Sequence, residues 1–240
     1  MQIMKQELID KLLIDKSYSI RRAFVDDFFF QNINVFNEQA SILDMGGKKE
    51  NKRGAFNIEN YNFNVKYANI DKSTKPDFLC DIKKIPVADN TFDGVILSEV
   101  IEHLSEPILV LEEAFRVLKK GGKLLIVTPF IYHVHADPYD YGRYTDYWYK
   151  EKLKTIGFED IRIEKQGLFF AVLVNMLKLY NYELFKIGKP KNLVLQKTFD
   201  AFIKLIIKKS FLWDAKKFIK SNSVTSNYTT GFGVIGKKSC

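Results

Sequence analysis

The stretch FLCDIKKIPVADNTFDGVILSEVIEHLSEPILVLEEAFRVLKKGGKLLIVTP, residues 78–129, decides the fold of this 240-residue chain. It holds two short apolar runs, at 94–97 and 123–127, which predict buried strands. Between them Pro107 suits the first turn of a helix, which should end at the glycine pair 121–122. A strand, a helix and a strand in this order predict neighbouring parallel strands with the helix packed on the sheet.

The same alternation continues on both sides of that stretch. Upstream, apolar runs at 41–45 and 65–70 predict two strands, and 78–80 predicts a short third. Downstream, the segments 159–165 and 231–237 predict the last two strands. We therefore expect an α/β fold built on one doubly wound, mostly parallel sheet.

We expect four segments along the chain. Residues 1–39 form an N-terminal helical segment, 40–167 form the core with the sheet, 168–222 form a helical insertion, and 223–240 hold the last strand of the core. The N-terminal helical segment is expected because apolar residues recur at helical spacing. They are Leu8, Leu12, Ile20, Phe24 and Phe28.

Composition and charge restrict the class of protein. Apolar residues make up 46% of the chain, which is enough for a sizeable core. The net charge of +8 belongs to segment 168–222, which holds eleven lysines against Glu183, Asp200 and Asp214, while the rest of the chain is neutral. One basic segment beside a neutral core does not predict a protein that coats nucleic acid, so a nucleic-acid partner is not expected.

The chain lacks the sequence marks of secretion and of membrane spanning. No run of 18 apolar residues occurs, and the first residues contain no uninterrupted apolar stretch of the kind found in secretion signals. The two cysteines, Cys80 and Cys240, predict neither a structural disulfide nor a zinc cluster. We therefore expect a cytoplasmic protein without a bound metal, with peripheral contact at the inner membrane face as an option.

Acidic residues follow the first four predicted strands. Asp44, Asp71 and Asp81 come at the ends of the first three, and Glu99 comes just after the fourth. Ligands of a doubly wound sheet bind beyond the carboxyl ends of its strands, and a carboxylate there can accept hydrogen bonds from both hydroxyls of a ribose. Any one of these acids alone is better explained as a cap or turn residue, but four in succession favour a nucleoside site.

Three linked motifs resemble class I methyltransferases that use S-adenosyl-L-methionine (SAM), and specifically their UbiE-like, type 11 group. The motifs are IPVADNTFD at 85–93, EVIEH at 99–103 and RVLKKGG at 116–122. The resemblance covers about residues 40–167 and the last strand. It implies a Rossmann-like, seven-stranded sheet with an antiparallel final strand, SAM as cofactor, and methyltransferase activity.

The resemblance also implies roles for residues at the strand ends. Asp71 matches the acid that holds the ribose hydroxyls of SAM. Asp81 and the backbone of Ile82 match the adenine-binding position, and Glu99 lies where the fourth-strand motif faces the cofactor. All four residues are therefore candidates for cofactor binding.

The first motif of the family departs from its usual form here. Asp44, Gly46 and Gly47 match the part that wraps the methionine and ribose of SAM, but the third glycine of Asp-x-Gly-x-Gly-x-Gly is absent. Residues 50–62 show no helical stripe, so the helix N-terminus that usually receives the methionine carboxylate should be missing. Basic residues at 48–53 are candidates to supply positive charge instead. A homologue that has lost SAM binding stays an alternative.

The loop after the fifth strand, FIYHVHADPYDYGRYT at 130–145, is the expected acceptor site, because loops at this end of a sheet carry substrate contacts. His133 or His135 is a candidate general base for a hydroxyl acceptor, although either could simply pack in the loop, and His103 is expected to be structural. The loop also resembles one in methyltransferases of bacterial glycan-biosynthesis clusters. Candidate acceptor contacts are Tyr132, Asp137, Tyr141, Arg143 and Tyr144.

The basic insertion predicts an amphipathic helix whose lysines, such as Lys197, Lys204 and Lys208, lie away from its apolar face. Such a helix can lie on an anionic membrane. We favour a lid whose apolar face packs on the domain, and binding of an anionic acceptor such as a lipid-linked sugar phosphate is a third option. The apolar positions are Leu195, Phe199, Phe202 and Ile206, followed by Phe211, Trp213, Phe218 and Ile219.

The sequence thus predicts SAM-dependent methyl transfer to a small or glycan-like acceptor in polysaccharide biosynthesis, with oxygen favoured as the methylated atom. Alignment of donor and acceptor can contribute about 7–11 kcal/mol to such a transfer. A quinone or another lipid is the alternative acceptor. A catalytically inactive SAM-fold partner protein at the membrane surface is the alternative that is not an enzyme.

Overall fold

The computed structural model describes residues 4–50, 52–187, 193–222 and 224–239. The chain divides into two compact units, and each is discontinuous in sequence. One unit, which holds most of the sheet, comprises Phe30–Glu164 and Phe232–Cys240, and the other, which is helical, comprises Met1–Phe29 and Lys165–Gly231. The helical unit joins the N-terminal helices to the insertion, a grouping that the sequence did not reveal.

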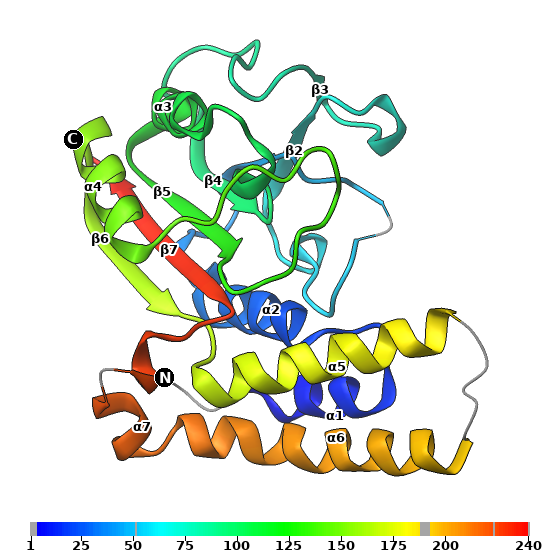
Figure 1. The fold of residues 1–240 in the computed structure, drawn as a ribbon. Helices are drawn as coiled ribbons and strands as arrows, with labels where there is room; N and C mark the ends of the chain where they lie inside the picture. Colours follow the sequence, from blue (N-terminus) through cyan, green and yellow to red (C-terminus); the bar gives the residue numbers. More distant parts are fainter. Residues whose placement is uncertain (1–3, 51, 188–192, 223, 240) are drawn as a thin grey trace. The chain divides into compact units, whose positions relative to one another are not determined.

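Within the described residues the sheet has seven strands in the order β3-β2-β1-β4-β5-β7-β6 (Figure 1). Strands β1 to β5 pair in parallel, and Figure 1 shows β7 running opposite to β5. This confirms the predicted Rossmann-like sheet. The strands are β1 (Ser41–Met45), β2 (Asn64–Asn69), β3 (Phe78–Leu79), β4 (Phe92–Ser98), β5 (Leu118–Pro129), β6 (Phe158–Lys165) and β7 (Gly231–Lys238).

Parallel pairing brings the predicted ligand residues to one edge of the sheet. The register aligns Asp44 with Tyr67 on one side and with Ile96 on the other. Ser98 at the end of β4 aligns with Val127 near the end of β5. Because these carboxyl ends share one edge, the loops that follow them converge on the same place.

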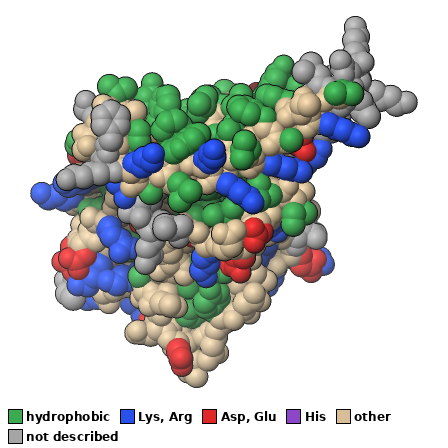
Figure 2. All heavy atoms as spheres, turned by 90° about the horizontal axis from the view of Figure 1, so that it is seen from below, with side chains coloured by type: hydrophobic (Ala, Val, Ile, Leu, Met, Phe, Trp, Pro, Cys, Tyr) green, Lys and Arg blue, Asp and Glu red, His purple; other side chains and the backbone are tan. Residues whose placement is uncertain are grey.

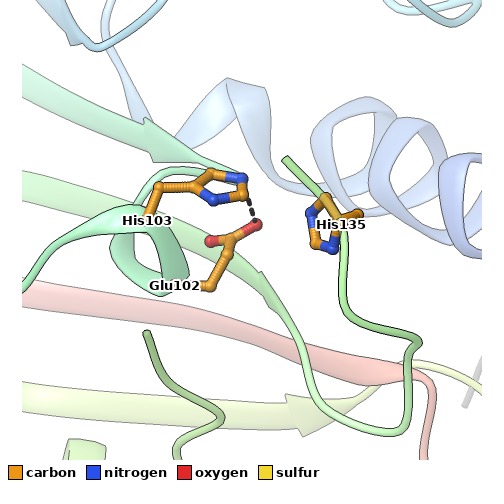
Figure 3. A group of neighbouring side chains, drawn as sticks. All are labelled: Glu102, His103 and His135. Carbon is orange, nitrogen blue, oxygen red and sulfur yellow. Dashed lines mark ion pairs between the residues drawn. The ribbon is translucent and has the colours of Figure 1, made fainter. Parts of the chain in front are cut away.

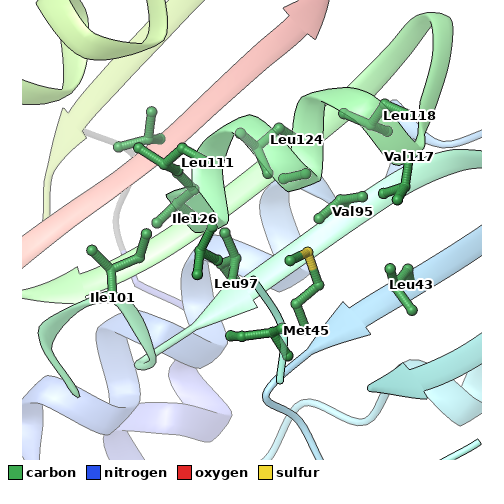
Figure 4. Close-up of a cluster of buried hydrophobic side chains, with 14 of the residues drawn as sticks. Leu43, Met45, Val95, Leu97, Ile101, Leu111, Val117, Leu118, Leu124 and Ile126 are labelled. Atoms are coloured by element: carbon green, nitrogen blue, oxygen red, sulfur yellow. The ribbon is translucent and has the colours of Figure 1, made fainter. Parts of the chain in front are cut away.

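Helix α3 (Pro107–Val117) covers the sheet through its apolar face. Its buried residues Val110, Leu111 and Ala114 belong to one cluster with Leu97 and Ile126 of the sheet (Figure 4). Fully buried aliphatic side chains of this size each stabilise the fold by about 1.5–3 kcal/mol relative to exposure. The cluster therefore fixes the strands whose ends carry the site.

Helix α3 ends earlier than the glycine pair predicted. The helix stops at Val117, and Leu118 already pairs with Phe92 as part of β5. The carbonyl of Val117 accepts a hydrogen bond from the N–H of Thr91, so the backbone leaves the helix to pair with the segment before β4. Gly94 then pairs with Lys123, which places 119–122 in an irregular part of the ladder instead of at a helix end.

The second helix of this unit, α4 (Asp146–Ile156), has a conventional beginning and end. The Thr145 side chain caps it by accepting a hydrogen bond from the N–H of Trp148 at 3.3 Å. It ends at Gly157, whose φ of 117° is in the left-handed region that glycine adopts without strain. The acceptor loop 130–145 thus runs between two fixed points, the end of β5 and the start of α4.

The helical unit is built around a hairpin of α5 (Phe169–Ile187) and α6 (Leu193–Asp214), which lie side by side (Figure 1). It also contains α1 (Gln6–Ile14), most of α2 (Ile20–Asn32) and α7 (Lys217–Ser221). The N-terminal segment forms two helices because the Asp15 side chain accepts hydrogen bonds from the N–H groups of Ser17 and Tyr18 and turns the chain. Nowhere in the described ranges is there a helix apolar and long enough to cross a membrane.

The buried face of α6 differs from the one that the sequence predicted. Ile203 and Ile207 are buried, whereas Phe202 of the predicted stripe is 50% exposed. Phe211 and Ile219, which were among the predicted apolar positions, are buried. Helix α6 carries apolar residues around more than one face, so periodicity alone could not show which face packs. The side chains of Leu195 and Phe218 lie outside the part of the chain that the structure describes.

The last residue of α6, Asp214, holds the start of α5. Its buried carboxylate accepts hydrogen bonds from the N–H groups of Leu168, Phe170 and Ala171 at 2.8, 2.9 and 3.0 Å. N–H groups in the first turn of a helix have no partner within the helix, so a carboxylate there satisfies them. Burial raises the pKa of the Asp214 carboxyl, and the three hydrogen bonds lower it.

Replacing Asp214 with alanine is expected to lower the free energy of unfolding by about 3 kcal/mol, because three N–H groups lose a buried charged acceptor. Asp214→Asn retains one acceptor oxygen and should lose about half as much. Urea unfolding followed by circular dichroism measures both values. A loss below about 1 kcal/mol for the alanine variant would show that the cap is unimportant.

Candidate functional site

A glycine loop follows β1 at the carboxyl edge of the sheet. Gly46 has a φ of 86°, and a Cβ there would lie 2.8 Å from the Val100 side chain. A Cβ on Gly47 would lie 2.2 Å from the carboxyl group of Asp44. Both positions therefore require glycine. The side-chain amide of Asn69 donates hydrogen bonds to the carbonyl oxygens of Gly46 and Gly47 at 2.9 and 3.0 Å, which fixes the loop.

No α-helix follows this loop in the described residues between β1 and β2, as the sequence predicted. Of the basic residues at 48–53, Lys49 forms an ion pair with Asp77 at 2.9 Å. Lys52 forms one with Glu59 at 3.3 Å, and its charge also lowers the pKa of Asp44. These two lysines therefore neutralise acids of the protein itself, and their predicted role toward a ligand stays a prediction.

The Asp44 carboxyl is buried beneath the glycine loop. Its Oδ1 atom has no hydrogen-bond partner among the described residues, while the N–H of Gly47 hydrogen-bonds to the carboxyl group. Burial raises the pKa of Asp44 to about 6, and the nearby charge of Lys52 only partly opposes this effect. A buried acceptor without a partner is costly to the fold, so Asp44 is suited to a donor supplied by a ligand.

A cleft of about 620 Å³ opens at this edge of the sheet. That volume lies within the range of roughly 300–1,000 Å³ that is usual for small-molecule sites. Four of the predicted cofactor residues line the cleft: Gly46, Asp81, Ile82 and Glu99. The other three, Asp44, Gly47 and Asp71, are not among the residues that line it. Asn69 lines it as well, which the sequence did not predict.

Glu99, which lines the cleft, has a strained backbone conformation. Its φ of 56° is in the left-handed region, which costs a non-glycine residue about 1–3 kcal/mol. Its N–H donates to the carbonyl of Val127 at 2.8 Å, which anchors the turn to β5. Strain held in place by the surrounding structure is concentrated at functional sites, so it supports a role for Glu99.

Asp71 occupies a different environment from the other strand-end acids. Its side chain is exposed and accepts hydrogen bonds from the N–H and hydroxyl of Ser73, both at 2.8 Å. These bonds lower the pKa of Asp71 and cap the short helix η3 (Lys72–Thr74). The carboxylate keeps further lone pairs for a ribose, so its predicted role stays a prediction.

The acceptor loop 130–145 folds against the short helix η4 (Ile101–His103). The N–H groups of Tyr141 and Gly142 donate to the carbonyl oxygen of Glu102 at 2.8 and 3.2 Å. The Nδ1 atom of His103 lies 2.6 Å from the carbonyl oxygen of Tyr139. His103, Tyr139 and Tyr141 all line the cleft, so the loop forms part of its wall, and His103 has a place in the site that the sequence did not predict.

Glu102, His103 and His135 face one another behind this wall (Figure 3). The Glu102 side chain is fully buried, and its Oε1 lies 3.6 Å from Nε2 of His103. The two imidazole rings have centroids 4.9 Å apart. Each of the three residues offers a ligand atom within 4.8 Å of the others, so this group could hold a divalent cation.

The surroundings of His135 determine which ring nitrogen carries its proton. Nδ1 lies 3.1 Å from the carbonyl oxygen of His133 and 3.3 Å from Oδ2 of Asp140. Both neighbours accept hydrogen bonds, so the neutral ring places its proton on Nδ1 and leaves the lone pair on Nε2. Arg143 binds both oxygens of Asp140, at 2.5 and 2.8 Å, and holds the pKa of Asp140 far below its usual range. His135 is therefore arranged to accept a proton at Nε2.

The remaining predicted acceptor contacts are spread along the loop. Arg143 donates hydrogen bonds to Asp140, and Tyr144 stacks on Trp148 of α4 with ring centroids 4.2 Å apart. Tyr132 packs on the ring of His133, and Asp137 is exposed. Of the predicted contacts, Tyr141 is therefore the one that the structure places on the cleft wall.

The sequence model of the type 11 methyltransferase family, described as a methyltransferase domain, matches residues 55–126. That range includes the three motifs and the strands β3 and β4, which Asp81 and Glu99 follow. Over residues 55–126 the chain therefore carries a methyltransferase domain of the type 11 group. The match does not extend to the glycine loop, the acceptor loop or the helical insertion.

Curated relatives match this chain over short segments. A ubiquinone/menaquinone biosynthesis C-methyltransferase of Desulfotalea psychrophila is 42% identical over 45 residues, which are 19% of this chain and 18% of that protein. A demethylmenaquinone methyltransferase of Renibacterium salmoninarum is 37% identical over 67 residues, 27% of this chain and 28% of that protein. The chain thus matches less than a third of the length of either relative.

Solved structures of low identity share the whole fold. A SAM-dependent methyltransferase from Archaeoglobus fulgidus has a TM-score of 0.53 and 18% identity, over 90% of this chain and 94% of that one. The [4+2]-cyclase SpnF has a TM-score of 0.57 and 14% identity, over 91% of this chain and 81% of that one. These similarities show the fold of the methyltransferase domain and leave its reaction to be argued from the site.

Proposed function

We propose that this chain binds SAM in the 620 Å³ cleft and transfers its methyl group to an acceptor. The observation that carries the proposal is the buried Asp44 carboxyl, whose Oδ1 lies beneath a loop that only glycine can form and has no partner among the described residues. SAM supplies an activated methyl group on a sulfonium. Asp44 and the backbone of Gly46 and Gly47 would hold its methionine and ribose part.

The rest of the cofactor fits the other residues of the cleft. Asp81 and Ile82, which line it, would receive the adenine, because a carboxylate and a backbone carbonyl accept hydrogen bonds from its amino group. Glu99 lies on the same wall and would accept from a donor of the cofactor. Asp71 would receive the ribose hydroxyls after its cap on Ser73 rearranges.

The acceptor is a hydroxyl group of a small or glycan-like molecule. As the hydroxyl oxygen forms its bond to the methyl carbon, the bond from that carbon to sulfur breaks, and S-adenosylhomocysteine leaves. The hydroxyl proton passes to Nε2 of His135, whose Nδ1 faces Asp140 and the His133 carbonyl. The exposed aromatic rings of Tyr139 and Tyr141 supply apolar faces with hydroxyl groups, which suit a sugar.

A quinone or another lipid is the second candidate acceptor. Its support is the similarity of short segments of the chain to the quinone-pathway methyltransferases named above. The family match stops at residue 126, before the loop that would choose the acceptor. A catalytically inactive SAM-fold protein is the third candidate, supported by the altered glycine loop and by the lack of an α-helix after it in the described residues.

One assay separates these candidates. Purified protein is incubated with SAM and, in turn, with nucleotide sugars, lipid-linked glycans and hydroquinones, and release of S-adenosylhomocysteine is measured. The proposal expects turnover with a hydroxylated sugar acceptor, and turnover only with hydroquinones would replace it with the second candidate. Turnover should survive EDTA. Activity lost to EDTA and restored by a divalent cation would assign Glu102, His103 and His135 to a metal instead of to a base.

A further inference from the structure

Two neighbouring helices of the helical unit present apolar side chains to solvent. On α5, Leu173, Met176, Tyr180 and Leu184 are all exposed, with Tyr180 at 60%. At about 100° per residue these four side chains fall within an arc of about 80°, so they form one stripe along the helix. A stripe of this kind is normally buried, and on this helix a different face packs inward through residues such as Ala171 and Val174.

Helix α6 carries a second exposed stripe. Val194, Phe202, Leu205 and Leu212 are between 50% and 71% exposed, and they also fall within an arc of about 80°. Helices α5 and α6 lie side by side, so both stripes belong to one pair of neighbouring helices. Figure 2 shows hydrophobic side chains gathered over much of the upper half of the view, with Lys and Arg side chains among them.

The charges beside the α6 stripe have one sign. Lys197, Lys204 and Lys208 lie along one side of it, Lys209 falls within its arc, and all four are exposed. The acids of α6 do not oppose them. Asp214 is buried under the start of α5, and Asp200 is partly buried beside Lys16 and Lys204, at 4.0 and 3.2 Å. The exposed stripe of α6 is therefore apolar, with one lysine within it and cationic side chains along one margin.

We propose that this surface of α5 and α6 docks on an anionic lipid membrane. Apolar side chains of such a helix enter the boundary between headgroups and acyl chains, while flanking lysines remain at the level of the headgroups. Anionic headgroups attract these lysines, which gives the contact its charge selectivity. A bilayer accommodates apolar and cationic groups along both helices at once, whereas a protein partner would need a matching acidic rim. The inference does not depend on the reaction proposed above.

Vesicle flotation tests the docking directly. The full chain is mixed with vesicles of phosphatidylcholine alone or with about 30% phosphatidylglycerol, and the bound fraction is measured at low and high salt. The double variant Leu205→Glu/Leu212→Glu should bind anionic vesicles at least about tenfold more weakly than the wild type. Lys204→Gln/Lys208→Gln/Lys209→Gln should lose binding and most of its salt dependence.

The matched control is Tyr147→Glu, which changes an exposed apolar residue on α4, outside the surface. It should bind vesicles as the wild type does. Circular dichroism and S-adenosylhomocysteine affinity check that each variant remains folded. The proposal fails if the wild type stays unbound with anionic vesicles. It also fails if Leu205→Glu/Leu212→Glu leaves flotation unchanged and instead alters turnover or converts a dimer to a monomer, which would assign the surface to a lid or to self-association.

Discussion

Replacing His135 with asparagine is expected to lower kcat by about 10²–10⁴-fold while the affinity for S-adenosylhomocysteine stays unchanged. The side chain loses the Nε2 lone pair that receives the acceptor proton, and positioned proton transfer is worth that factor. His135 belongs to the acceptor loop and has no predicted contact with the cofactor, so the cofactor should still bind. Stopped assays of S-adenosylhomocysteine release and calorimetric titration of the same preparation give the two quantities.

His133→Ala is the matched control for His135→Asn, since His133 interacts with His135 through its backbone carbonyl, which the substitution keeps. If His133→Ala loses as much activity as His135→Asn, or if His135→Asn keeps more than half of kcat, the base is assigned to the wrong residue.

Replacing Asp44 with asparagine is expected to weaken S-adenosylhomocysteine binding by about 10- to 100-fold, because a charged acceptor of the ligand becomes neutral. The same change should alter the pH dependence of stability. Burial raises the pKa of Asp44 from 3.8 to about 6 in the folded chain. Residues that bind a ligand often lower the stability of the fold.

The sign of the pH effect follows from proton binding. Between pH 3.8 and about 6, the folded chain holds a proton on Asp44 that the unfolded chain has lost. Raising the pH through this window therefore costs stability, by up to about 3 kcal/mol at about 1.4 kcal/mol per pKa unit. The stability of Asp44→Asn relative to the wild type should rise by that amount from pH 4 to pH 7. Urea unfolding measures both free energies. If the difference in free energy of unfolding between Asp44→Asn and the wild type is the same at both pH values, the burial of a charged Asp44 is contradicted.

The parallel sheet of this protein could be predicted from a few residues. The stretch 78–129 predicted two neighbouring parallel strands, and β4 pairs with β5 in parallel. The end of α3 could not be read in the same way. The glycine pair suggested a helix end, but the pairing of Leu118 with Phe92 is a long-range contact that local sequence does not encode.

The candidate site was predictable where it depends on strand ends. Asp81 and Glu99 line the cleft because each follows a strand of the same edge. Asn69 and the pairing of His135 with Asp140 were missed, since both depend on how loops fold back. Asn69 at the end of β2 could have been noticed as a polar residue at the sheet edge. The exposed face of α6 was missed because its apolar residues surround the helix.

The central claim is that the cleft binds SAM, and calorimetric titration of S-adenosylhomocysteine into the purified chain tests it most directly. The account predicts one site per chain with micromolar affinity, retained in Tyr147→Glu and weakened about 10- to 100-fold in Asp44→Asn. An absence of binding by SAM and S-adenosylhomocysteine to a chain that circular dichroism shows to be folded would contradict it. The altered glycine loop would then mark a domain that has lost its cofactor.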